Sequence, residues 1–136
     1  MRSQTPETDE LERVLRLVPD AAERHYGLAL VRAFVLEDHE GAVEQLRLAV
    51  EADPSHSMAL CRLGGYYLKL ERHGEAVGAY RRAIKVGGRG GLAAVDGLYM
   101  TLYVMGEKGR ELVGGDSVLQ AVDPELARCI LERRVR

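Results

Sequence analysis

The side chains best suited to chemistry in this sequence are its four histidines and two cysteines. The histidines are His25, His39, His56 and His73, and no pair of them has the HExxH spacing of a helical zinc site. Asp38, His39 and Glu40 adjoin in an expected turn, where side chains of consecutive residues point in different directions and do not converge on a metal. The sequence also lacks a GxSxG motif, and Cys61 has no recognisable partner for nucleophilic catalysis. We therefore predict that the chain is not an enzyme, binds no metal and uses no cofactor.

The glycine-rich segment 87–91, GGRGG, raises the alternative of a phosphate-binding loop. A P-loop needs a following Lys-Ser or Lys-Thr pair and a preceding strand, and neither is expected here. Four glycines in five residues instead favour a bend or a loose joint between helices.

Composition restricts the class of protein further. The chain has 136 residues, of which 46% are hydrophobic and 29% are charged, which is typical of one compact globular domain. Its N-terminal residues are polar and acidic, unlike a signal peptide, and no apolar run reaches the ~20 residues of a membrane span. Cys61 and Cys129 form no CxxC pair, so we expect two reduced, buried thiols in a cytoplasmic protein.

Charge is unevenly distributed along the chain. Residues 23–56 contain three basic and seven acidic residues, whereas 57–90 contain seven basic and two acidic ones. These opposite charges are consistent with solvated helix faces, a dipolar partner or a second copy of the chain. Because the basic residues spread around two expected helices and the net charge is −2, we predict no nucleic-acid binding.

Periodicity predicts helices that would position these side chains. Thr5 and Pro6 are typical of a helix start, and a leading helix over 7–18 would carry one apolar stripe, made of Leu11, Val14, Leu15 and Val18. Pro19 and Asp20 end it and start the next helix. Further helices are expected over 21–36, 41–52, 57–70 and 75–86, with polar turns between them, and no alternating pattern predicts a strand.

The same helix pair occurs twice with an offset of 34 residues. Ala42, Leu46 and Ala49 of the first pair correspond to Ala76, Tyr80 and Ala83 of the second. Gly64 and Ala76 lie where the two helices of a hairpin should approach closely, and Tyr80 is expected to face the following hairpin. A helix over 92–105 and a segment 110–122 before Asp123-Pro124 suggest a degenerate third unit whose register is shifted by two residues, followed by a closing helix.

This pattern resembles the tetratricopeptide repeat. The second unit carries that family's signature residues almost in full, namely Leu60, Leu63, Gly64, Tyr67, Ala76, Tyr80 and Ala83. The resemblance implies an all-α fold, a right-handed superhelix of antiparallel helix hairpins in a single domain. Its parts would be a leading helix at 7–18, repeats at 23–56, 57–90 and 91–123, and a C-terminal capping helix at 124–136.

In that family the first helix of each hairpin lines a concave groove that binds partners. The resemblance assigns the following residues to the groove: Val31, Val35, Met58, Cys61, Arg62, Gly65, Leu68, Lys69, Thr101, Val104 and Met105. The places of the family's carboxylate clamp hold Gly27, Val31, Arg62 and Gly97, so binding of chaperone C-terminal tails is not expected. The groove would be mainly apolar and suited to a hydrophobic or amphipathic segment.

The functional hypothesis is therefore a protein-binding adaptor or chaperone-like module. Bacterial secretion chaperones have a similar plan of three repeats with flanking helices. The alternative is a structural scaffold subunit that forms a homo-oligomer through its repeat ends or its acidic and basic faces.

Overall fold

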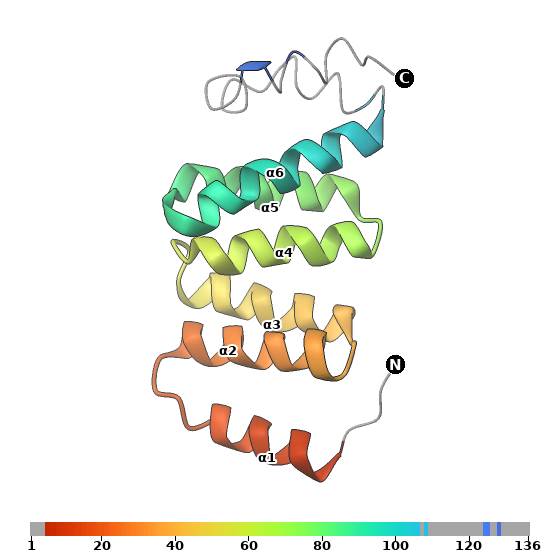
Figure 1. The fold of residues 1–136 in the computed structure, drawn as a ribbon. Helices are drawn as coiled ribbons and strands as arrows, with labels where there is room; N and C mark the ends of the chain where they lie inside the picture. Colours follow the sequence, from red (N-terminus) through yellow and green to blue (C-terminus); the bar gives the residue numbers. More distant parts are fainter. Residues whose placement is uncertain (1–4, 107, 109–123, 126–127, 129–136) are drawn as a thin grey trace.

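The computed structural model describes residues 5–106, 108, 124–125 and 128, and in this part the chain is a stack of helices without a strand (Figure 1). The elements are α1 (Pro6–Leu15), α2 (Ala21–Leu30), the π-helical turn η1 (Val31–Val35), α3 (His39–Ala52), α4 (Ser57–Lys69), α5 (His73–Val86) and α6 (Gly88–Met105). The predicted all-α fold of antiparallel helix hairpins is confirmed. The predicted second helix of the third unit and the helix at 124–136 lie outside the described residues, apart from the isolated positions above.

Side chains cap the helix starts. Thr5 and Thr8 form a reciprocal capping box at α1, with 2.8 Å between the Thr5 backbone N and the Thr8 Oγ1. Asp20 accepts from the Glu23 backbone N–H at 3.0 Å to cap α2, and Asp38 caps α3 through the Gly41 N–H at 2.9 Å. Because Asp38 is the cap, His39 and Glu40 belong to the first turn of α3 rather than to the predicted loop.

Only part of the apolar stripe predicted for the leading helix faces the stack: Leu15 and Val18 are half-buried, and Leu15 packs against Gly27 of α2. Leu11 and Val14 are 43% and 53% exposed, whereas Glu12 is only 3% exposed. The Glu12 carboxylate lies 3.4 Å from an Arg16 Nη atom and 3.6 Å from an Arg32 Nη atom, so an ionic contact to η1 orients α1 with the Glu12 carboxylate inward. α1 also ends at Leu15, three residues before the predicted boundary.

The predicted helix over 21–36 ends in a π-helical turn. The Leu36 backbone N–H donates to the Val31 carbonyl at 3.2 Å, a bond over five residues instead of four. Phe34, an apolar residue within this turn, is 62% exposed.

The glycine run at 87–91 is a tight packing site and not a loose joint. Gly87, with φ of 85°, forms the turn, and α6 begins already at Gly88. A Cβ on Gly90 would collide with the backbone of Ser57 and Met58, and one on Gly91 would lie 2.9 Å from the Ala83 carbonyl oxygen. Because these glycines have no side chain, the backbone of α6 can contact the backbones of α4 and α5.

The 34-residue period continues through residues 87–91 into α6. The register shift of two residues predicted for the third unit does not occur in this helix. Ala94, Leu98 and Thr101 are each 0% exposed, and they lie 34 residues after Leu60, Gly64 and Tyr67, which also face the interior. The close approach at Gly90 and Gly91 keeps α6 in the same repeat register as α4, because this contact fixes the position of α6 on the preceding hairpin.

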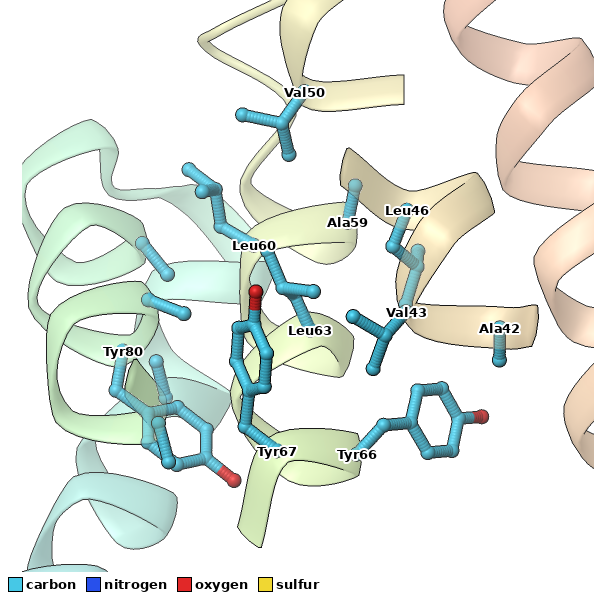
Figure 2. Packing of buried hydrophobic residues seen from close by; sticks show 14 of the residues in the cluster. Ala42, Val43, Leu46, Val50, Ala59, Leu60, Leu63, Tyr66, Tyr67 and Tyr80 are labelled. Atoms are coloured by element: carbon cyan, nitrogen blue, oxygen red, sulfur yellow. The ribbon is translucent and has the colours of Figure 1, made fainter. Parts of the chain in front are cut away.

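Tyr80 of α5 is central to the packing between α4 and α6 (Figure 2). A Cβ on Gly64 would lie 2.8 Å from its ring, and one on Gly97 would overlap the ring and hydroxyl. The predicted close approach at Gly64 is therefore confirmed, as is the expectation that Tyr80 faces the following hairpin. In Figure 2, Leu46 and Val43 from α3 lie on the other side of α4, near Ala59 and Tyr66.

Candidate functional site

The first helices of the hairpins, α2 with η1, α4 and α6, form one face of the stack, which we call the first-helix face. Arg62 of α4 links two of these helices. Its Nε donates to the Tyr26 hydroxyl of α2 at 2.7 Å, and its guanidinium carbon lies 5.6 Å from the ring centre of Phe34 in η1 and 5.9 Å from that of Tyr26. A cation held between two aromatic rings therefore bridges the first and second repeats.

Electrostatics keep Arg62 charged. Partial burial alone would lower its pKa, but the hydrogen bond to Tyr26 and the nearby phenols of Tyr26 and Tyr66 outweigh burial and raise it. Burial in turn raises the pKa of Tyr66, partly offset by the Arg62 charge. The centre of the first-helix face is thus a permanent cation surrounded by neutral phenols.

Seven residues further along α4, Lys69 is exposed, and its Nζ lies 5.9 Å from the Tyr66 ring centre. The sequence of α4, SMALCRLGGYYLK, contains no acidic residue. Within the part of the chain that the structure describes, neither Arg62 nor Lys69 forms an ion pair.

The residues predicted to line the groove differ in how far their side chains are exposed. Val31 and Thr101 are 5% and 0% exposed, and the Thr101 hydroxyl donates to the Gly97 carbonyl at 2.8 Å, so both side chains belong to the interior. The half-buried members are Val35, Met58, Cys61, Arg62, Gly65, Leu68 and Met105. Lys69 and Val104 are exposed. Cys61, Leu68 and Met105 also pack against the core, so each offers only part of its surface to a partner.

Phe34 is the residue that sequence reasoning missed. It lies 34 residues before Leu68, so the repeat period that assigns Leu68 to the groove assigns Phe34 there as well. The predicted groove residues do not include it, and the structure places it on the surface beside Arg62.

Cys61 is a free thiol beside this cation. Burial raises its pKa, and the Arg62 charge only partly opposes that effect. The thiol therefore stays protonated at neutral pH and is a poor nucleophile. Among the residues described, no group of three or more His, Cys, Asp or Glu side chains could hold a metal ion.

The structure shows a cleft away from the first-helix face. This cleft of about 620 Å³ runs between the second helices, α3 and α5, above α4. Leu63 and Tyr67 are the α4 residues that line it, and the others are Arg47, Val50, Glu51, Pro54, Glu75, Gly78, Ala79 and Arg82. Helical periodicity alone does not predict this cleft, because periodicity does not show that α3 and α5 remain apart.

The stacked hairpins, their 34-residue period and the shared first-helix face define a helical-repeat solenoid, a class that offers an extended surface to other molecules. The family model of the tetratricopeptide repeat matches residues 9–57 and 32–93, which together cover more than half of the chain. The chain therefore belongs to the tetratricopeptide repeat family, whose repeats are non-catalytic modules that generally mediate protein–protein interactions. No curated protein matches the sequence.

None of the helices in the described residues combines the length and apolar character that crossing a bilayer requires.

Proposed function

We propose that this protein binds an apolar or amphipathic segment of a partner protein on its first-helix face. The observation that carries the proposal is Phe34, a large aromatic side chain that remains 62% exposed beside Arg62 of the next repeat. Covering an exposed phenylalanine contributes about 1.5–3 kcal/mol, so Phe34 can act as an anchor for association.

Other half-buried residues of α4 support an adaptable apolar contact. Met58 and Cys61 lie half-buried on α4 and offer polarizable sulfur atoms, which fit irregular partners. Gly65, also half-buried, adds no side chain, so a partner backbone can approach α4 closely. An adaptor or chaperone-like role fits this surface, and the reduced Cys61 thiol is compatible with a cytoplasmic site of action.

The test is binding of peptides selected from a random displayed library against the full chain. Phe34→Glu, and separately Met58→Glu combined with Leu68→Glu, should weaken the selected peptides at least tenfold because each places a charge on the apolar contact. Val86→Glu is the matched control, since Val86 is a comparably exposed apolar residue at 42% but lies on α5. Circular dichroism should show unchanged helicity in all variants. Binding that survives the first-helix variants, or a library that yields no binder, would contradict the proposal.

A second candidate function is that of a self-associating scaffold subunit. It is favoured by the exposed apolar side of α1 and the turn after it, where Leu17 is 79% exposed in addition to Leu11 and Val14. Clustered exposed apolar side chains often mark an interface. Measurement of the oligomeric state in solution tests this candidate function.

A further inference from the structure

Among the described residues, two arginines lie over tyrosine rings, and only one of them is paired with a carboxylate of that part of the chain. The guanidinium carbon of Arg72 is 4.8 Å from the Tyr67 ring centre, and its Nε and an Nη atom donate to the two oxygens of Glu75 at 2.7 and 2.8 Å. Arg62 is placed similarly against Tyr26 and Phe34, yet its Nε donates to a neutral hydroxyl. No carboxylate of the described residues completes its coordination.

The lack of a carboxylate partner among the described residues is costly for Arg62 because of its environment. Its side chain is half-buried, so the charge has lost part of its hydration. A guanidinium has five N–H donors, and phenol oxygens satisfy them less strongly than a carboxylate does. A partly desolvated cation without a counter-charge is unfavourable, and an incoming anion removes that penalty.

The charges on α4 itself favour an anion. α4 carries Lys69 as its other cation and has no acidic side chain. The offset of seven residues between Arg62 and Lys69 places them about 10 Å apart along the helix axis. α4 therefore presents two separate cations on either side of Gly65. Phe34 of η1 lies against Arg62, and Leu68 directly precedes Lys69.

We propose that the partner is an acidic amphipathic segment whose Asp or Glu side chain binds Arg62 while its apolar side chains cover Phe34 and Leu68. The inference rests on the proposed function and names the chemistry of the partner. A second acid would reach Lys69 if it follows about seven residues later in a helical segment, or about three residues later in an extended one. The ligand is a side-chain carboxylate, so the segment can lie inside a longer chain.

The experiment uses the library-selected peptides, synthesised with amidated C-termini so that the side chains supply the only carboxylates. We expect the selected sequences to be enriched in Asp and Glu relative to the starting library. Glu→Gln at the critical peptide position and Arg62→Gln in the protein should each weaken binding about tenfold by fluorescence anisotropy. The two changes together should weaken binding little more than either alone, because both remove the same contact.

Three protein variants separate charge from packing. Arg62→Lys retains the charge and should restore part of the affinity, whereas Tyr26→Phe removes the Arg62 hydrogen bond and should leave the preference for acidic peptides intact. Arg82→Gln is the matched control, because Arg82 is an exposed cation of α5 that also forms no ion pair with a described residue. It should change affinity less than twofold.

The outcomes distinguish this inference from the proposed function. Peptides that need Phe34 but show no acid enrichment, or that ignore Arg62→Gln, would overturn the inference and leave apolar binding standing. Additive effects of the peptide and protein substitutions would also overturn it, because the two groups would then not be in contact. Loss of all binders, or binding that ignores Phe34→Glu, would refute both.

Discussion

Tyr80 shows at the residue scale how one side chain organises the interface between two repeats. Its ring fills the space that Gly64 and Gly97 leave, and it is 5% exposed. Burial, with a smaller contribution from Cys61, raises the pKa of Tyr80 to about 12. The phenol must therefore stay neutral for the repeats to pack, which links stability to alkaline pH.

Tyr80 is expected to make the fold sensitive to pH between about 10 and 12. In the unfolded chain its pKa is about 10, so below that pH both states are protonated and the contribution to stability is complete. As the pH rises through the folded-state pKa of about 12, the unfolded state is favoured by about 2–3 kcal/mol. Tyr80→Phe keeps the ring and lacks this titration.

This effect can be measured by denaturant unfolding of the natural chain and of Tyr80→Phe. The measurement is made at pH 8 and at several values up to pH 12. The two free energies of unfolding should diverge above pH 10, with the variant becoming relatively more stable. Other titrating groups are common to both chains and cancel in the difference. A constant difference at all pH values would contradict the prediction.

At the element scale, glycines inside helices have two different roles. A Cβ on Gly90 of α6 would meet the backbone of α4, whereas one on Gly78 of α5 would meet nothing within 4 Å. Neither residue has a positive φ, so steric surroundings alone distinguish them. The first glycine is required for packing, and the second only lowers the helix propensity of α5.

Alanine at these two positions should act in opposite directions. Gly78→Ala should raise the free energy of unfolding by about 0.5–1 kcal/mol, the usual gain in an exposed helix. Gly90→Ala should lower it by about 1–3 kcal/mol, because α6 must move away from Ser57 and Met58. Urea unfolding followed by circular dichroism compares them, and shifts of the same sign would argue against the close approach of α6 and α4.

At the scale of the whole molecule, the stack leaves apolar surface at α1 that the fold does not cover. The contact between Glu12 and Arg32 places the Glu12 carboxylate inward and leaves Leu11 and Val14 outside. An ionic contact thus decides which side of the end helix is available for association.

If α1 forms a self-association interface, the chain should be oligomeric in solution. Leu11→Glu combined with Val14→Glu should then give a monomer by sedimentation or light scattering, because the charges oppose burial of that surface. The assembly should persist in high salt, since apolar contacts are not screened. A monomer at all concentrations and salts would rule out the scaffold candidate.

Local patterns predicted a large part of this structure. The helix starts at Thr5 and Asp20, the hairpin over 57–86 and the role of Gly64 follow from capping chemistry and from the 34-residue period. These features depend on residues close in sequence or on a repeated contact, so composition and spacing are sufficient to indicate them.

By itself, the sequence determined the repeat, its period and the positions of Arg62 and Leu68 on the first-helix face. Only the tertiary structure decided that Leu11 and Val14 of α1 lie outside, that Phe34 lies beside Arg62, and that Gly90 brings α6 against α4. The physical reason is that helical periodicity tells which side chains share a face but not what lies opposite that face. A buried ionic contact, a π-helical turn and a backbone approach each depend on a neighbouring helix.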